Sequence, residues 1–208
     1  MAGSTRQRNM RGQGALLRDE ILTAAVRVVD SSQTANEVSL RSIAREAGIS
    51  TMSVYGHFDS REDLLSAVAE LGWDQLQQDI AAQVQSGKTP RERLLLGCRA
   101  YVAFAQRFPL RYVLMVKVDE ITPSARQALQ VVTRGLLASG GMDPDSEPGA
   151  DAQRAAAALS VALHGVAMLH RTDTPHLWLS DFSTCEIIQS LVDSAILLLE
   201  QGTAAPRA

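Results

Sequence analysis

The chain has 208 residues, of which 46% are apolar and 21% are charged, and its formal net charge is −3. This composition is typical of a globular protein with a substantial core, and it excludes a polycation that binds nucleic acid over its whole surface. The two cysteines, Cys98 and Cys185, are too few and too far apart for a disulfide framework or a zinc cluster, and we expect both to be core thiols.

Charge is unevenly distributed along the chain. Residues 1–18 carry four arginines and no acid, whereas residues 63–208 carry 16 acids and 12 bases. We expect residues 1–14 to form a disordered basic arm and residues 203–208 a disordered tail. The first 15 residues lack the apolar segment of a signal peptide, which predicts a cytoplasmic protein.

Most of the chain between these ends predicts helices, about nine in total, so the expected fold class is all-α. Alternating β-branched runs with hairpin turns, which would indicate a sheet, are not found in the sequence. A first helix has apolar side chains on one face, at Leu17, Ile21, Ala24, Ala25 and Val28. A short second helix has such a stripe at Leu40, Ile43, Ala44 and Ala47. Thr-Pro pairs at 89–90 and 122–123 mark two further helix starts.

The stretch 48–58, GISTMSVYGHF, follows the second helix almost without a gap. Ser39 is placed to cap that helix, and Gly48 is placed to end it in a left-handed conformation. Ser50 can then cap a third helix only two residues later, so the two helices form a helix-turn-helix. Two interpretations are open: a plain helical pair with a solvated polar face, or an element whose third helix enters the major groove of DNA.

The side chains around this turn suit DNA binding. Short hydroxyls can exchange hydrogen bonds with base edges, and a threonine methyl or a methionine can make apolar contact with them. The candidate base-reading residues are Ser50, Thr51, Met52 and Ser53. Val54 and Phe58 lie four residues apart and are expected to face the core. The groups placed to grip phosphates on either side of the groove are Ser39, Ser42, Tyr55, His57 and Arg61.

The segment SLRSIAREAGISTMSVYGHFDSREDLL resembles the DNA-binding domain of TetR-family transcriptional regulators, over roughly residues 15–70. The matching features are "IA..AGIS" after an apolar helix, a tyrosine two residues before "HF", and a basic residue and an acid before "LL". The resemblance implies a three-helix DNA-binding domain over residues 15–60 and a ligand-binding, dimer-forming helical body over residues 61–202. ALHGVAML resembles a His-Gly element of one group of such bodies.

The resemblance also implies roles for individual residues. It places base contacts at Thr51, Met52 and Ser53, and phosphate contacts at Ser39, Ser50, Tyr55, His57 and Arg61. Family members often have a lysine where Arg61 stands and a basic or larger residue where Gly56 stands, so one backbone contact is in doubt at Gly56. Some members insert a basic arm into the minor groove. The residues that either do so here or belong to a solvated tail are Arg6, Arg8 and Arg11.

Two long helices are expected near the carboxyl end, over residues 152–170 and 183–200. They carry apolar side chains on more faces than one partner would cover, which predicts a homodimer through a four-helix interface. The alternative is that these helices fill only an intramolecular core. The apolar stretch Ala155–Leu169 is shorter than the ~20 residues of a membrane span, so no membrane association is predicted.

A small-molecule pocket is expected in the helical body, built from aromatic and methionine side chains, although such side chains at helical spacing are also typical of a plain core. The candidates are Tyr101, Phe104, Phe108, Tyr112, Met115, His164, Met168 and Trp178. His164, His170 and His176 are six residues apart, which is wrong for two metal ligands on one helical face. Neither a metal nor a cofactor is therefore predicted.

Catalytic motifs such as G-x-S-x-G are not found in the sequence, which favours a protein that is not an enzyme. The leading prediction is a homodimeric repressor that binds a palindromic double-stranded DNA operator. An unknown small molecule would shift its equilibrium between two spacings of the reading helices, with a helix over residues 61–84 as the lever. Two alternatives are a helical protein–protein adaptor without DNA binding and an enzyme on a helical scaffold.

Overall fold

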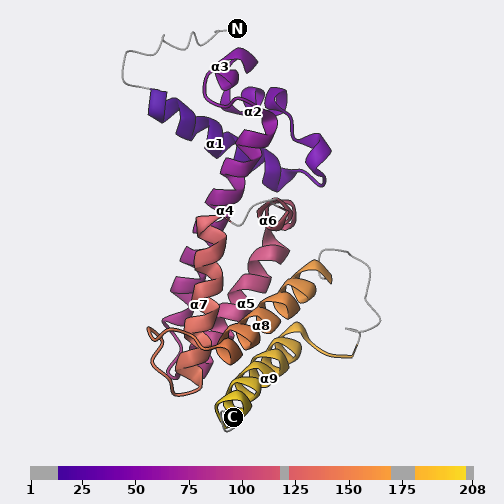
Figure 1. The fold of residues 1–208 in the computed structure, drawn as a ribbon. Coiled ribbons are helices and arrows are strands. Elements are labelled where there is room, and N and C mark those ends of the chain that lie inside the picture. Colours follow the sequence, from indigo (N-terminus) through magenta and orange to yellow (C-terminus); the bar gives the residue numbers. More distant parts are fainter. Residues whose placement is uncertain (1–13, 118–121, 170–180, 205–208) are drawn as a thin grey trace. The chain divides into compact units, whose positions relative to one another are not determined.

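The computed structural model describes residues 14–117, 122–169 and 181–204, and these residues form nine α-helices, one 3-10 turn and no strand (Figure 1). The predicted all-α fold is confirmed. Some sequence-based predictions fall outside the described residues, namely those for Arg6, Arg8, Arg11, His170, His176, Trp178 and the end of the tail.

By its contacts the chain divides into two compact units, one up to Ala69 and one from Glu70 onward. The division falls inside a single helix, α4 (Arg61–Val84). The domain boundary expected after residue 60 lies at the start of this helix, nine residues before the division. One uninterrupted helix therefore contributes residues to both units.

The first unit is built on short helices around a small apolar core. Its elements before α4 are α1 (Gly14–Ser31), the 3-10 turn η1 (Ala35–Glu37), α2 (Leu40–Ala47) and α3 (Thr51–Tyr55). Buried side chains that hold these elements together include Ile21, Ala25, Val29, Ile43, Ala44, Val54, Phe58 and Leu64. The expected inward orientation of Val54 and Phe58 is confirmed, so the carboxyl end of α3 and the turn after it are anchored in the core.

The second unit holds the rest of α4 and five further helices. These are α5 (Pro90–Arg107), α6 (Pro109–Val116), α7 (Pro123–Ser139), α8 (Ala150–Leu169) and α9 (Thr184–Ala204). The two Thr-Pro helix starts are confirmed: Thr89 caps α5 in a capping box with Glu92, and the Thr122 hydroxyl caps α7. Helices α8 and α9 lie side by side (Figure 1). They share a core with α5 and α7 that includes Leu94, Cys98, Leu136, Leu159, Leu163, Ile188 and Val192.

The expectation that both cysteines are core thiols holds for one of them. Cys98 is buried on α5, whereas Cys185 is exposed. Cys185 lies in the first turn of α9, one turn ahead of Ile188, the first buried side chain of that helix. The first turn of α9 therefore lies outside the core, and its apolar face is covered only from Ile188 onward.

Helix α8 is longer than the apolar stretch seen in the sequence. It has 20 residues, and an 18-residue window of it has a mean hydropathy of 1.2, so it is long and apolar enough to cross a membrane by length and composition alone. The same properties are found in the core helices of soluble proteins. Seven of its side chains, from Ala152 to Ala167, are buried inside the second unit, and 39% of the window is buried.

The two glycines that flank α3 predict opposite effects of substitution. Gly48 has a φ of 66°, in the left-handed region, whereas Gly56 has a φ of −69° and an ordinary helical conformation. A Cβ at Gly56 would lie 3.4 Å from the Ser53 carbonyl oxygen, an ordinary contact. Gly48→Ala is therefore expected to lower the free energy of unfolding by about 1 kcal/mol. Gly56→Ala, the matched control, should leave it unchanged or raise it, as measured by thermal denaturation. Equal losses would contradict this account.

Candidate functional site

The turn before α2 is fixed by a reciprocal pair of serines. The Ser39 hydroxyl accepts a hydrogen bond from the Ser42 amide at 3.1 Å, and the Ser42 hydroxyl oxygen accepts one from the Ser39 amide at 3.0 Å. Both side chains are half-buried. These serines, predicted to grip phosphate, first of all satisfy the free amides at the start of α2.

Helix α3 follows after a left-handed glycine and has a serine cap of its own. The Ser50 hydroxyl accepts a hydrogen bond from the Ser53 amide at 3.1 Å, and the two hydroxyls lie 2.9 Å apart. Only one hydroxyl hydrogen is used between them, so the other can still be donated outward. The cap therefore leaves hydrogen-bonding capacity at the exposed start of the helix.

The outer face of α3 exposes two large side chains. Met52 is 78% exposed and Tyr55 is 53% exposed, while Thr51, Ser53 and His57 are half-buried. Single exposed apolar residues are common, but a methionine and a tyrosine three residues apart on a five-residue helix form one outward face. The structure thus brings the predicted base-reading residues and Tyr55 onto one short helix.

Arg61, predicted to contact phosphate, is bound to the protein itself. Its Nε donates to the Val38 carbonyl oxygen at 2.7 Å, and one of its terminal nitrogens donates to the Ala35 carbonyl oxygen. The other terminal nitrogen lies 3.3 Å from Glu62, in an ion pair with an exposed partner. The guanidinium therefore ties the first residue of α4 to the segment that leads into α2.

Two other arginines lie on the solvent side of α2. Arg41 and Arg45 are both exposed and, being four residues apart, share one face of the helix. Arg18, on α1, instead stacks over the Phe58 ring at 4.8 Å, and Arg27 pairs with Glu46. Arg41 and Arg45 were not singled out from the sequence, although their spacing within the predicted helix was visible there.

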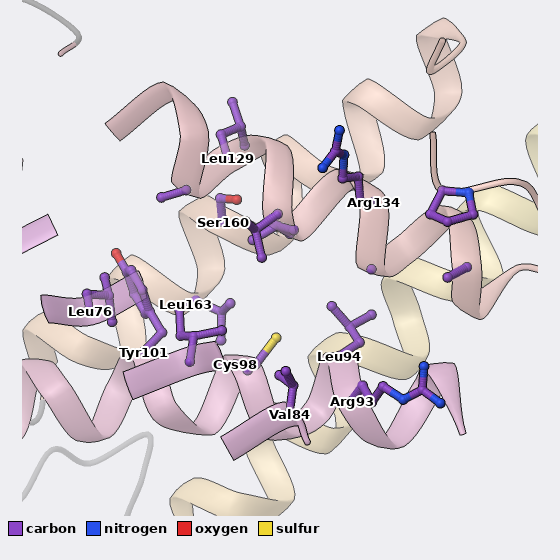
Figure 2. A pocket seen from close by; sticks show the side chains of 18 of the residues that line it. Leu76, Val84, Arg93, Leu94, Cys98, Tyr101, Leu129, Arg134, Ser160 and Leu163 are labelled. Atoms are coloured by element: carbon purple, nitrogen blue, oxygen red, sulfur yellow. The ribbon is translucent and has the colours of Figure 1, made fainter. Parts of the chain in front are cut away.

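The second unit contains a cavity of about 440 Å³, a size typical of small-molecule sites. Helices α4, α5, α7 and α8 supply most of its walls (Figure 2). The lining is mainly apolar and includes Trp73, Leu76, Leu94, Leu129, Val132 and Leu163. The space exists partly because small residues face it, among them Gly97, Ala125, Ala128 and Gly135.

A chain of hydrogen bonds begins at the cavity wall. The Tyr101 hydroxyl lies 2.7 Å from the Tyr112 hydroxyl, which lies 2.7 Å from Nδ1 of His164. Tyr101 lines the cavity on α5, Tyr112 is buried on α6 and His164 is half-buried on α8. Burial raises the pKa of Tyr101, so its phenol is neutral at pH 7. These hydrogen bonds link the cavity wall on α5 to α6 and α8.

Cys98 also lines the cavity. Burial raises the pKa of its thiol to about 12. A thiol with this pKa is protonated at neutral pH, and the thiolate is the reactive form of cysteine. The cavity therefore presents sulfur as an inert apolar surface.

Residues 21–68 match the family model of bacterial regulatory proteins of the tetR family, and residues 94–194 match the model of the tetracyclin repressor-like C-terminal domain. The chain belongs to the TetR family. It is a DNA-binding transcriptional regulator, which sets aside the adaptor without DNA binding. The matched ranges fall on the helix-turn-helix unit and on the unit that contains the cavity.

Relatives of this TetR-family regulator match it in part or in whole. The nucleoid occlusion factor SlmA of Vibrio vulnificus is 28% identical over 92 residues, 44% of this chain and 47% of the relative. The match thus spans about half the length of that relative. A Streptomyces coelicolor tetR-family transcriptional regulator has the same fold, with a TM-score of 0.68 and 20% identity over 90% of this chain and 84% of the other. A protein of unknown function from Rhodococcus sp. RHA1 matches with a TM-score of 0.69 and 24% identity, over 94% of this chain and 98% of the other.

The cavity of this TetR-family regulator includes one of the predicted pocket residues, Tyr101. Phe104, Tyr112 and Met115 are buried elsewhere in the second unit, and Phe108 packs against Phe104 with ring centroids 5.2 Å apart. His164 and Met168 are half-buried on α8 outside the cavity lining, and His164 is connected to it through the tyrosines. The residues that line the cavity along α4 and α7 had no distinguishing signal beyond apolar helical spacing.

Arg61→Met is expected to lower the free energy of unfolding of this regulator by about 2 kcal/mol, because two main-chain carbonyls lose a charged donor. Arg61→Lys should recover part of the loss, since an ammonium group lacks the planar fork of the guanidinium. Urea denaturation measures the effect. Arg45→Met, on the exposed face of α2, is the control and should change the stability little. If Arg61→Met were as stable as the control, Arg61 would not hold the domain together.

Proposed function

We propose that this regulator is a homodimeric repressor that reads a palindromic operator with α3 and releases it when a small molecule enters the cavity. The observation that carries the DNA-reading part is the exposed face of α3, where Met52 and Tyr55 project from a helix anchored by Val54 and Phe58. The proposal places the protein in the cytoplasm, where a bacterial operator is accessible.

The residues around α3 are proposed to fall into two groups, one that contacts bases and one that contacts phosphates. Thr51, Met52 and Ser53 are proposed to contact base edges in the major groove. Tyr55 and His57, with the serine hydroxyls at the two caps, are proposed to bind phosphates. Arg41 and Arg45 join them as cations, because both are exposed on the helix that precedes α3. Arg61 supports the site by positioning α2, and Arg6, Arg8 and Arg11 remain candidates for a minor-groove arm.

The dimer is proposed to form through α8 and α9. Val161 on α8 is 72% exposed, and Leu197 and Leu198 on α9 are 53% and 52% exposed. The two helices lie side by side, so these side chains belong to one pair of elements. Two copies of the pair would form the four-helix interface, and two half-sites would then be read together.

An effector in the cavity is proposed to act through α4. Trp73, Leu76, Ile80 and Val84 line the cavity from this helix, and the same helix begins in the DNA-binding unit at Arg61. A ligand that binds one conformation more tightly shifts the population toward it. The proposed outcome is an altered spacing between the two reading helices of the dimer.

The DNA-reading role is tested by electrophoretic mobility shift with DNA from upstream of the protein's own coding region, over a range of salt concentrations. Arg45→Ala should weaken binding to all sequences and reduce the salt slope by about one. Met52→Ala and Thr51→Ala should instead change the preference at individual base pairs, by about 1–3 kcal/mol each. Lys88→Ala, which removes an exposed cation between α4 and α5, is the control. Unchanged base preference in both α3 variants would show that another element reads the sequence.

The proposed interface is tested by sedimentation velocity at micromolar concentration. The wild-type chain of 22.4 kDa should sediment as a dimer. Val161→Arg and Leu197→Arg should each shift it toward monomer, because each places a charge within the apolar contact. Leu16→Arg is the control, because Leu16 on α1 is 62% exposed, between Leu197 and Val161. This variant should remain a dimer. A wild-type monomer, or dimers that tolerate both interface charges, would contradict the proposal.

A further inference from the structure

We propose that the cavity of the second unit takes an elongated apolar carboxylate, with its carboxylate between Arg93 and Arg134 and its chain directed toward Tyr101. The inference rests on the proposed role of the cavity as an effector site and gives the chemical class of that effector. It follows from the charge of the lining, the length of the cavity and the state of its polar groups.

The charged side chains that line the cavity have one sign. The charged residues among those that line it are Arg93 on α5 and Arg134 on α7, and no carboxylate occurs among these lining residues. The rest of the wall is mainly aliphatic. A ligand that matches this wall has an apolar body and a single anionic group, because a cation at the same end would meet two guanidinium groups.

The arginines lie at one end of the cavity. Figure 2 shows Arg134 above and Arg93 below, on different helices toward the right end of the view, with Leu76 and Tyr101 toward the left end. Arg93 and Tyr101 are eight residues apart on α5, which corresponds to ~12 Å along the helix axis. A ligand chain of about this length spans the distance from the cationic end to the phenol.

Both guanidinium groups can donate hydrogen bonds to a carboxylate. Arg93 is exposed, and its Nε and one terminal nitrogen donate to the carbonyl oxygens of Gly87 and Lys88, at 3.1 and 3.5 Å. These bonds orient the group without neutralising its charge. Arg134 pairs with Asp145 at 3.4 Å, but the two side chains are 63% and 75% exposed. Such a solvated pair is weak, and a ligand carboxylate can replace it.

The remaining polar groups are neutral and suit a non-covalent ligand. The Cys98 thiol, in the middle of the wall, is protonated at neutral pH, which disfavours an electrophile or an oxidant as the effector. The Ser160 hydroxyl donates to the Ala156 carbonyl oxygen at 2.8 Å. Recognition of charge is therefore concentrated at the arginine end.

The test compares ligands that share one chain length and differ in head group: decanoate, decanol and decyltrimethylammonium. Isothermal titration calorimetry with the full chain should show decanoate binding about tenfold or more tightly than decanol, the factor that one charge-assisted hydrogen bond contributes. Decyltrimethylammonium should bind more weakly than decanol. Equal affinity for decanoate and decanol would overturn the assignment of a carboxylate.

Variants locate the site. Arg93→Ala combined with Arg134→Ala should remove the preference for decanoate while leaving decanol binding unchanged, which also shows that the cavity is intact. Arg154→Ala, which removes an exposed arginine outside the cavity, should keep the preference. Ala128→Trp, which fills the cavity, should abolish binding of both ligands. Decanoate binding that survives Ala128→Trp, or a preference that survives the double arginine variant, would overturn the proposal.

A mobility shift without ligand, on the same protein preparation, separates this inference from the proposed function. Operator binding with no preference for decanoate would contradict the carboxylate effector and leave the regulator intact. Specific decanoate binding without any operator complex would support the ligand class and contradict the DNA-reading site.

Discussion

The two hydrogen bonds from the Arg61 guanidinium to main-chain carbonyls set the frame of the DNA-binding surface. Those carbonyls lie in the segment that leads into the Ser39 cap, so the first residue of α4 determines where α2 begins. Helix α2 in turn determines the position of α3, because only three residues separate them. The exposed side chains of α3 therefore depend on a contact between residues more than 20 positions apart. Arg61, which was predicted to contact phosphate, thus also ties α4 to the segment before α2.

The difference between local and distant contacts explains what the sequence could predict in the first unit. The serine caps, the left-handed Gly48 and the inward Val54 and Phe58 depend on neighbours within about one or two helical turns, and their spacing is visible in the sequence. The partners of Arg61 are backbone carbonyls, which every residue carries, so no side-chain pattern indicates them. The burial of Cys185 was mispredicted for a related reason: periodicity shows which face of a helix is apolar, but not where the neighbouring helix stops.

The residues that line the cavity were also difficult to predict from the sequence. Large aromatic residues draw attention in a sequence, yet Phe104, Tyr112 and Met115 fill the space around them and are buried. The residues that line the open volume include Gly97 of α5 and a glycine and three alanines of α7, and small residues are common in any helix. Apolar spacing thus predicted a helical body with a core, whereas the unfilled part of that core depends on how four helices meet. Arg93 and Arg134 line the same cavity only because α5 and α7 are packed in this arrangement.

The hydrogen bonds that connect Tyr101, Tyr112 and His164 can have either of two donor-to-acceptor directions. Each hydroxyl has one hydrogen to give. When Tyr112 accepts from one of these neighbours and donates to the other, the two hydrogen bonds run either toward the imidazole or away from it. If Nδ1 of His164 carries a hydrogen, Tyr101 has its own hydrogen left for an acceptor in the cavity; if Nδ1 is bare, Tyr101 is left with a lone pair for a donor. The tautomer of one histidine on α8 thereby sets which partner the wall of the cavity can accommodate. A molecule that engages Tyr101 would in turn select that tautomer, in a helix that Tyr101 itself does not belong to.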